Sequence, residues 1–497
     1  MKVLFMYPNM YSPIAHSPAL QAISGVLKSE GHQVDVIHIN NEFATPDKDH
    51  IILQKVKEFH PDIIGFTATS FEFTRSNQIA RYLKEKGINV PIILGGVHAT
   101  IAPHEYNGSN FDAFVVGDGE IAFSKIAEGA LQAKGIIQGE PVEDINQLPM
   151  TDWDLLDMAT ILNTKNGWLN LPLSRGCPYK CTFCGVPRIH EAKNYYTVRR
   201  KEVDKIMEEL LYLVRKFPVK VFNFDDDLFT LNYKWLMDFT SAYKKNIYDI
   251  YKIKYVIESR LDTLVDVTAK ALADSGCREI QFGLETGSQR LLDFVKKQLN
   301  YEKIIKGFAL CKKYGINSYA YVIFGIPGED EGTLNETISL IANVKPNLIR
   351  PTFLIPVKGT DLYDYCQKNG LFNGKEANVW NFEPVLNLPT ISNDVLMKYW
   401  MLFPWLINAK IGISGYEEEI RKYDGYGYDD LCSAETFNSI LERDMELTAK
   451  LAGSKTEHYR YHQEKRIKDK RNISFHRFEL ASFEKEIPQL VDIKIAN

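Results

Sequence analysis

Two long stretches of the chain alternate short apolar runs with helical patterns, and this alternation limits the possible fold more than any other feature. It is typical of a parallel sheet that helices cover on both faces. A doubly wound, Rossmann-like α/β domain is therefore predicted for the first stretch, residues 1 to about 140, with ligands binding beyond the carboxyl ends of its strands. Its five predicted strands are Lys2–Tyr7, Gln33–Ile39, Asp62–Ala68, Pro91–Gly95 and Asp112–Val116.

The alternation resumes from Leu169 to about Thr360. Six parallel strands with helical crossovers predict a partial (β/α)6 barrel, similar to a TIM barrel, with functional groups at the strand carboxyl ends. The predicted strands are Asn170–Ser174, Val219–Phe224, Lys254–Glu258, Glu279–Gly283, Ser318–Phe324 and Leu348–Ile355.

A chain of 497 residues is too long for one ordinary core and predicts several domains. We expect an N-terminal domain over 1–140, a linker over 141–168, the barrel over 169–364 and a mainly helical region over 365–497. That last region is a candidate wall of a substrate cavity.

Three cysteines lie in one short loop after the first predicted barrel strand, at Cys177, Cys181 and Cys184. Soft thiolates of this kind suit an iron–sulfur cluster better than a hard metal. Three of them can hold three irons of a cubane, which leaves the fourth iron open for a small molecule. The alternative is a zinc knuckle, which usually takes its four ligands as two pairs, but no second cysteine pair lies nearby.

The Cys-x3-Cys-x2-Cys spacing, with Phe183 before the last cysteine, resembles the radical S-adenosylmethionine (radical SAM) superfamily. The resemblance implies a [4Fe–4S] cluster whose open iron binds the amino and carboxylate groups of S-adenosylmethionine. It also implies that the reduced cluster splits this molecule into methionine and a 5′-deoxyadenosyl radical.

Other segments at predicted strand ends resemble the S-adenosylmethionine contacts of that superfamily. Asp226 or Asp227, in the run 225–227, is a candidate for the amino group, although the run could instead cap a helix and form a solvated turn. Arg260 is a candidate for the carboxylate, because a guanidinium binds a carboxylate with two donors. Glu285 is a candidate for the ribose or a nearby polar network. Either of these two could instead form a structural ion pair.

The segment that begins at Gly325 and ends at Glu329 resembles the part of the superfamily that faces the adenine. No side chain is assigned a catalytic role.

The N-terminal domain resembles the cobalamin-binding domain found in one branch of the superfamily, through the segments 64–67, 95–98 and 117–120. The Asp-x-His-x-x-Gly signature of a lower axial histidine is missing, so none is assigned. His98 and His16 are loop residues that could approach the corrin, or could be solvated or bonded to backbone. The residues that the resemblance places at the cofactor are Thr67, Gly95, Gly96, His98, Gly117 and Glu120.

The resemblance implies a cobalamin-dependent methyltransferase. In such an enzyme the adenosyl radical removes hydrogen from a substrate carbon, methylcobalamin supplies the methyl group, and a second S-adenosylmethionine remethylates the cobalt. An alternative is a cobalamin and radical SAM enzyme that performs cyclisation, ring contraction or oxidation. A methylthiotransferase is disfavoured because no cysteine precedes Cys177. A cobalamin sensor or carrier would leave the three cysteines unexplained.

Composition narrows the setting and the partners. The formal net charge of −5 predicts no general attraction to nucleic acid. No signal peptide or membrane span is expected, and seven cysteines, three of them clustered, fit a reducing, cytoplasmic compartment. We expect a small molecule or peptide as the substrate and an electron donor such as flavodoxin or ferredoxin.

Three C-terminal features remain. The apolar run 399–407 is interrupted by Pro404 and predicts a buried helix or a cavity wall. The basic run 455–477 predicts a solvated charged helix, or a surface for an acidic or phosphate-bearing partner. The remaining cysteines are expected to be packed thiols, and they are Cys277, Cys311, Cys366 and Cys432.

Overall fold

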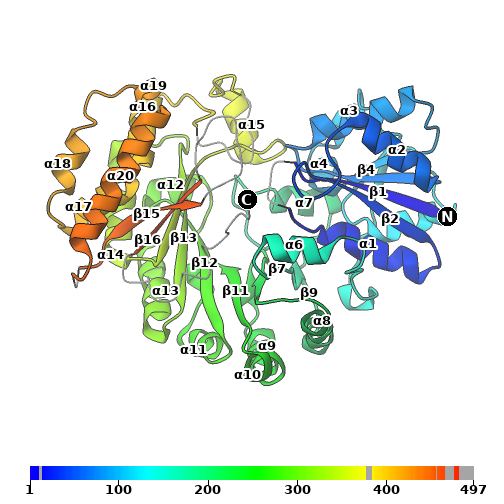
Figure 1. Ribbon diagram of the computed structural model, residues 1–497, viewed down its shortest axis with the longest axis horizontal. Coiled ribbons are helices and arrows are strands. Elements are labelled where there is room, and N and C mark those ends of the chain that lie inside the picture. Colours follow the sequence, from blue (N-terminus) through cyan, green and yellow to red (C-terminus); the bar gives the residue numbers. More distant parts are fainter. Residues whose placement is uncertain (11–13, 376–382, 455, 465–474, 481–497) are drawn as a thin grey trace. The chain divides into compact units, whose positions relative to one another are not determined.

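The computed structural model describes residues 1–10, 14–375, 383–454, 456–464 and 475–480. These residues form two compact units (Figure 1). Unit 1 contains residues 1–227 and 356–365, and unit 2 contains the other described residues from 228 onward. The predicted domain border at residue 140 therefore falls inside unit 1.

Unit 1 begins with a six-stranded parallel sheet in the order β2-β1-β3-β4-β5-β6. The five predicted strands are confirmed to within one residue at each end, and a sixth extends the edge. The doubly wound fold class is thereby confirmed. The strands are β1 (Lys2–Pro8), β2 (Gln33–Ile39), β3 (Ile63–Thr67), β4 (Ile92–Gly95), β5 (Ala113–Val116) and β6 (Gly135–Gln138).

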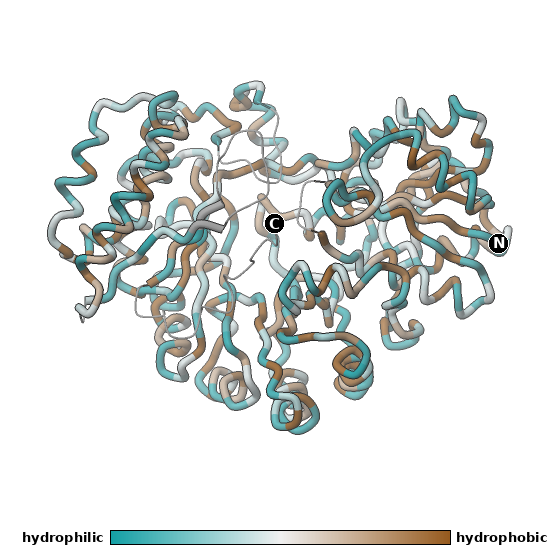
Figure 2. The backbone as a smooth tube through the Cα atoms, viewed as in Figure 1, coloured by the Kyte–Doolittle hydropathy of each residue, from teal (hydrophilic) through white to brown (hydrophobic). Residues whose placement is uncertain are grey.

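Helices cover both faces of this sheet, and consecutive residues of β1 point alternately into two cores. Leu4 and Met6 pack with residues of α2 (Asp49–Phe59) and α3 (Phe73–Glu85). Val3 and Phe5 pack with residues of α1 (Pro18–Ser29) and α5 (Glu120–Ala127). Figure 2 shows these strands as continuous hydrophobic segments, as expected of a sheet buried on both sides. The short helices α4 (Gly96–Ile101) and η1 (Pro103–Tyr106) follow β4.

The rest of unit 1 carries the loop that holds the three cysteines. Strand β7 pairs in parallel with β10, and β8 pairs with β9 in a short antiparallel ladder. The elements are η2 (Ile145–Gln147), α6 (Met158–Thr164), β7 (Trp168–Asn170), β8 (Ser174–Arg175), α7 (Val186–Lys193), β9 (Arg199–Arg200), α8 (Val203–Lys216) and β10 (Val221–Phe224).

The first barrel strand lies earlier in the chain than predicted. It runs from Trp168 to Asn170, whereas the predicted strand ran from Asn170 to Ser174. Two features interrupt the ladder beyond that point. Pro172 has no N–H to donate, and the N–H of Leu173 donates to the carboxylate of Asp226, at 3.2 Å, and not to a neighbouring strand.

Unit 2 is built on a sheet in the order β11-β12-β13-β14-β16-β15, in which β11 to β14 are parallel. All the later predicted barrel strands are confirmed as elements. The strands are β11 (Lys254–Ser259), β12 (Cys277–Glu285), β13 (Asn317–Phe324), β14 (Leu348–Phe353), β15 (Tyr459–Glu464) and β16 (Phe475–Leu480).

Helices follow each parallel strand of unit 2 and then form most of the C-terminal region, as predicted. They are η3 (Phe229–Leu231), α9 (Tyr233–Tyr243), η4 (Lys244–Tyr248), α10 (Asp249–Tyr251), η5 (Leu261–Thr263), α11 (Asp266–Asp274), α12 (Gln289–Phe294), α13 (Tyr301–Tyr314), α14 (Glu331–Val344), α15 (Asp361–Lys368), α16 (Asn393–Met401), α17 (Phe403–Ile411), α18 (Tyr416–Arg421), α19 (Tyr428–Leu431) and α20 (Ala434–Leu451). Helix α15 begins in the unit 1 segment 356–365.

The charged helix predicted over 455–477 is wrong for its described part. Residues 459–464 form β15, which pairs with β16 in antiparallel fashion. Tyr459 is buried, and the Arg460 side chain pairs with Glu479 across the ladder. Successive side chains of a strand point to opposite faces of the sheet. The many charged residues in this run hid that alternation and suggested a solvated helix. Residues 455 and 465–474 lie outside the described residues.

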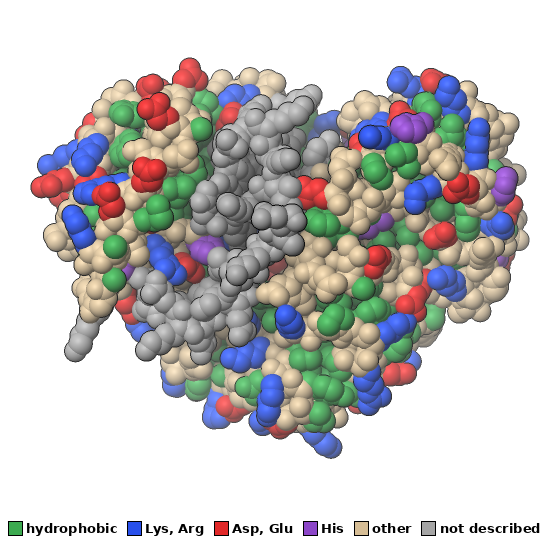
Figure 3. All heavy atoms as spheres, in the orientation of Figure 1, with side chains coloured by type: hydrophobic (Ala, Val, Ile, Leu, Met, Phe, Trp, Pro, Cys, Tyr) green, Lys and Arg blue, Asp and Glu red, His purple; other side chains and the backbone are tan. Residues whose placement is uncertain are grey.

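The apolar run 399–407 lies at the end of α16 and in α17, and Trp405 is fully buried. Among the described residues no helix is long and apolar enough to cross a membrane. Basic and acidic side chains are interspersed over the visible face in Figure 3. Of the four remaining cysteines, Cys277, Cys311 and Cys366 are buried and Cys432 is half-buried.

Candidate cofactor site

Hydrogen bonds hold the cysteine loop just before Cys177 and again between Cys181 and Cys184. Before Cys177, the Ser174 hydroxyl donates to Asp226, and the N–H of Gly176 donates to Asp227 at 3.0 Å. After Cys181, the carbonyl of Thr182 accepts from the N–H of Leu362 at 3.0 Å. The loop is therefore fixed by the turn after β10 and by the segment 356–365 of the same unit.

Gly176 occupies a position that only glycine can fill. Its φ of +100° is a left-handed conformation, and a Cβ there would lie 2.7 Å from the ring of His190 in α7. This close approach folds the loop tightly just before Cys177.

The three thiols fit an iron–sulfur cluster. The pKa of Cys184 is raised to about 12, mainly by burial and in part by the nearby Asp227, Cys181 and Cys177, so the ligands lie within electrostatic reach of one another. A bound iron would remove these protons. The Cys184 sulfur also accepts from the N–H of Val186 at 3.5 Å, which is the kind of bond that tunes such clusters.

Among the described residues no three Cys, His, Asp or Glu side chains converge on a single metal ion. A zinc site needs such convergence, whereas each ligand of a cubane binds a different iron. Three thiols in one loop match the number of protein ligands that such a cubane takes, whereas a zinc knuckle would need a fourth ligand.

The two candidate carboxylates at the end of β10 have different surroundings. Asp226 is fully buried and accepts from Ser174 and from the N–H of Leu173, and burial raises its pKa to about 7. Asp227 is exposed, and among the described residues its one hydrogen bond comes from the N–H of Gly176. Asp227 is therefore the better placed of the two to receive a ligand ammonium.

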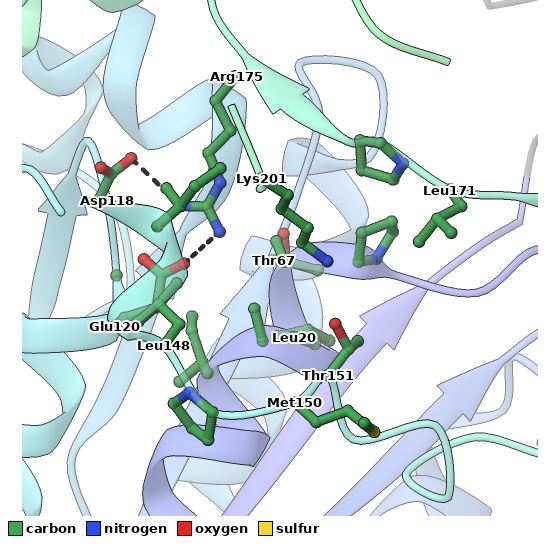
Figure 4. Close-up of a pocket in the computed structure, with 18 of the residues that line it drawn as sticks. Leu20, Thr67, Asp118, Glu120, Leu148, Met150, Thr151, Leu171, Arg175 and Lys201 are labelled. Atoms are coloured by element: carbon green, nitrogen blue, oxygen red, sulfur yellow. Dashed lines mark hydrogen bonds and ion pairs between the residues drawn. The ribbon is translucent and has the colours of Figure 1, made fainter. Parts of the chain in front are cut away.

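A cavity of about 460 Å³ lies at the carboxyl ends of the N-terminal strands. Phe5 and Phe66 form part of its wall, and the loop from Leu171 to Arg175 that leads into Cys177 forms another part. Figure 4 shows Leu20, Thr67, Leu148 and Lys201 around this space. Five of the residues predicted to bind cobalamin line it, namely Thr67, Gly95, Gly96, Gly117 and Glu120.

The glycines let backbone form the cavity wall. Gly96 has a φ of +88°, and a Cβ there would lie 2.7 Å from the hydroxyl of Thr67. Gly117 has a φ of +92°. Gly95 has an ordinary extended backbone and open space where its Cβ would be, since the nearest atom is 3.8 Å away. Such a wall fits a large flat ligand such as a corrin.

The two histidines considered for the corrin lie elsewhere. His98 does not line the cavity but stacks on Phe73 at 3.9 Å between ring centroids, and its Nε2 lies 3.6 Å from Glu105. His16 is buried, with Nδ1 2.7 Å from Gln21 and Nε2 2.7 Å from the carbonyl of Asn170. Burial lowers the pKa of each histidine to about 4. Both rings are held within the protein by these contacts.

Unit 2 holds the remaining candidates, two of which form buried ion pairs. Arg260 binds Asp262 through two nitrogens, at 2.9 and 3.1 Å, and also donates to the carbonyl of Lys297 at 2.7 Å. The Lys297 ammonium lies 2.6 Å from Glu285. This is the structural alternative that the sequence left open, and the ligand roles of Arg260 and Glu285 stay predictions.

The backbone around this pair is unusual. Glu285, Lys296 and Gln298 have φ values of +66°, +54° and +57°. Left-handed conformations are costly for residues other than glycine, and they cluster at functional sites.

Gly325 follows β13 with a φ of +83°, and its N–H donates to the carboxyl group of Glu329. Glu329 is almost fully buried, and burial raises its pKa to about 8. A neutral carboxyl group therefore holds the turn that was predicted to face the adenine.

We expect Glu329 to make the protein less stable as pH rises. The unfolded chain loses the Glu329 proton near pH 4.5, whereas the folded protein keeps it to about pH 8. Between these values the unfolded state binds fewer protons, so this residue lowers the free energy of unfolding by about 1 kcal/mol per pH unit. In Glu329→Gln this contribution should vanish, which thermal melting between pH 5.5 and 8.5 would measure. Glu336→Gln, on the exposed face of α14, is the control, and an unchanged slope in Glu329→Gln would contradict the assignment.

Apart from Glu120, the sequence did not indicate the charged residues that join the cavity to the cysteine loop. Arg175 extends from β8 to Glu120, at 2.6 Å, and towards Asp118, at 3.9 Å, as the dashed lines in Figure 4 show. Lys201 binds Glu209 at 2.6 Å, and Glu209 accepts from the indole of Trp153 at 3.0 Å. Arg175 lies 55 residues from Glu120 and 57 from Asp118 along the chain, and Glu209 lies 56 residues from Trp153. Only Lys201 and Glu209, which are 8 residues apart, are close enough for a sequence pattern to suggest their contact.

Comparison with known proteins agrees with this geometry. The family model of the B12 binding domain matches residues 11–127, and that of the radical SAM superfamily matches residues 171–341. The first match covers β2 to β5 of the N-terminal sheet, and the second runs from just before the cysteine loop into α14.

Similar proteins include methyltransferases and a cyclase. An uncharacterized methyltransferase of Pyrococcus horikoshii is 27% identical over 424 residues, which are 80% of this chain and 90% of the relative. The anaerobic magnesium-protoporphyrin IX monomethyl ester cyclase of Rubrivivax gelatinosus is 25% identical over 417 residues, which are 77% of this chain and 72% of the relative.

A solved structure shares the fold. The cobalamin-dependent S-adenosylmethionine radical enzyme OxsB, with aqua-cobalamin and S-adenosylmethionine bound, superposes with a TM-score of 0.65 at 16% identity. The superposition covers 85% of this chain and 70% of OxsB.

Proposed function

Because the chain belongs to the radical SAM superfamily and carries a B12 binding domain before its radical SAM domain, we propose that it is a cobalamin-dependent methyltransferase that acts on a carbon atom of its substrate. Its cofactors are a [4Fe–4S] cluster, S-adenosylmethionine and cobalamin. When bound, they supply one-electron reduction, hydrogen abstraction and methyl transfer, which no side chain provides.

One observation supports the proposal most directly. The cavity lined by the glycine turns and the loop that leads into Cys177 belong to the same compact unit, and Leu171–Arg175 forms a wall of that cavity. A carrier of cobalamin alone would not need cluster ligands so close to its binding cavity. A radical enzyme that uses cobalamin needs both in one site.

The protein's own groups bind and position the cofactors. Cys177, Cys181 and Cys184 would hold the cluster, and the hydrogen bonds from Ser174 and Gly176 to Asp226 and Asp227 fix the approach to it. Thr67, Gly95, Gly96, Gly117 and Glu120 would hold cobalamin in the cavity. The apolar part of that wall, which includes Phe5, Phe66 and Leu171, excludes water from reactive groups.

The products of the reaction test the function. Anaerobically reconstituted enzyme, given cobalamin, S-adenosylmethionine, a reductant such as flavodoxin or ferredoxin and candidate small-molecule or peptide substrates, should release a methylated product. It should also release both 5′-deoxyadenosine and S-adenosylhomocysteine. Release of 5′-deoxyadenosine with a converted but unmethylated product would instead identify a cyclase or oxidase.

We expect Asp227→Asn to weaken the binding of S-adenosylmethionine by about tenfold to a hundredfold, the usual effect of losing a charged hydrogen bond. Iron content should stay unchanged, because an asparagine oxygen can still accept from Gly176. Perturbation of the cluster's electron paramagnetic resonance signal during a titration with S-adenosylmethionine would measure the affinity. Asp226→Asn is the matched comparison, since that side chain is enclosed. If Asp226→Asn keeps its iron and alone loses affinity, the ammonium is bound at Asp226.

A further inference from the structure

Five charged side chains form a network beside the cavity. Asp118 binds Lys193 through one oxygen and Arg199 through the other. Glu120 binds Arg175 at 2.6 Å. Burial would raise the pKa of Asp118, but its bonds to Arg199 and Lys193 outweigh burial and hold that pKa well below its usual range. Asp118 is therefore charged at neutral pH.

The two signs of charge come from different parts of the chain. The carboxylates belong to the turn after β5, and Asp118, Gly119 and Glu120 line the cavity. The cations flank the cysteine loop, with Arg175 two residues before Cys177, and with Lys193 at the end of α7 and Arg199 in β9 after Cys184. Arg175 and Arg199 are also paired in the β8–β9 ladder.

Most of this network is buried, although the Arg175 side chain is 32% exposed. Asp118, Glu120 and Arg199 are 6%, 3% and 7% exposed. Separating a buried carboxylate from its cation leaves an uncompensated charge, which is strongly destabilising. The turn after β5 and the two ends of the cysteine loop should therefore move together or not at all.

We propose that this ionic network couples the two cofactor sites, so that cluster assembly tightens cobalamin binding and bound cobalamin stabilises the cluster. The inference rests on the proposed function. A cofactor that orders one side of the network orders the other side too. The factor by which the cluster tightens cobalamin binding must equal the factor by which cobalamin tightens binding of the cluster. Asp118, Lys193 and Arg199 are positioning residues in this scheme.

Lys193 suits the test because it does not line the cavity itself, and it reaches the cavity wall through its ion pair with Asp118 and through its packing beside Gly117. The affinity for hydroxocobalamin is measured anaerobically, by absorbance after equilibrium dialysis, for the full chain with and without a reconstituted cluster. We expect the cluster to tighten binding about tenfold in the unaltered protein, and less than about twofold in Lys193→Gln. A structural role alone would weaken binding in both forms and leave this ratio unchanged.

Glu120→Gln removes a charge but little volume, and it gives a second measurement if Lys193→Gln fails to fold. Arg75→Gln is the matched control, because Arg75 pairs with Asp47 at 2.8 Å in the same domain and lies outside the cavity wall. It should keep the tenfold ratio. The coupling would be overturned if the unaltered protein bound cobalamin equally well with and without the cluster. It would also be overturned if both Lys193→Gln and Glu120→Gln kept the tenfold ratio of affinities. Absence of cobalamin binding in every form would instead contradict the proposed function.

Discussion

Cys181→Ala is expected to lose nearly all bound iron and all cleavage of S-adenosylmethionine. Cys181 is the buried member of the three cysteines, and its removal leaves a cubane with two protein ligands from this loop. Altering residues that only surround a metal ligand costs about tenfold to a hundredfold in activity, so the loss of a ligand should cost more than about a hundredfold. Iron and sulfide analysis after reconstitution, with release of 5′-deoxyadenosine, would measure both effects.

A measurement of cobalamin binding shows whether the variant has lost only its cluster or has unfolded. Cys181 does not line the cavity, so the variant should still bind hydroxocobalamin, weakened by no more than the coupling to the cluster. Cys432→Ala is the control, because Cys432 is a half-buried thiol of unit 2, and it should retain about four irons per chain. If Cys181→Ala kept its iron and its cleavage activity, these cysteines would not be the cluster ligands.

The sheets could be predicted because their signal is local. Each buried parallel strand is a short apolar run, and for the N-terminal domain every predicted end lies within one residue of the observed one. The first barrel strand was misplaced for two reasons. Pro172, which the sequence shows, has no N–H for the ladder, and a distant carboxylate, Asp226, takes the N–H of Leu173. A long-range hydrogen bond of this kind leaves no trace in the local pattern.

The candidate site could be predicted only in part, for a similar reason. Sequence identified residue types at strand ends, and Asp227 and the cavity glycines lie where a ligand could reach them. It could not distinguish a ligand-binding Arg260 from one paired with Asp262, because both uses need the same guanidinium. The pairing of Arg175 with Glu120 was also invisible, since these residues approach each other only in the folded chain.

Gly95→Leu is expected to weaken cobalamin binding by about tenfold to a hundredfold, which is the usual cost of overfilling a packed site. Gly95 lines the cavity, its φ of −123° suits any residue, and its Cβ would meet no atom closer than 3.8 Å. A larger side chain therefore takes up ligand space without straining the backbone. This distinguishes Gly95 from Gly96, where a φ of +88° and the Thr67 hydroxyl would disturb the fold as well.

A graded series at the same position supplies the control for Gly95→Leu. Gly95→Ala should bind hydroxocobalamin almost as the unaltered protein does, because one methyl group fits the open space, whereas Gly95→Leu should not. Iron content and melting temperature should stay near those of the unaltered protein in both variants, since the change touches neither the cysteine loop nor the two cores. Full cobalamin affinity in Gly95→Leu would mean that the corrin does not rest on this turn, and the cofactor would have to be placed against another wall of the cavity.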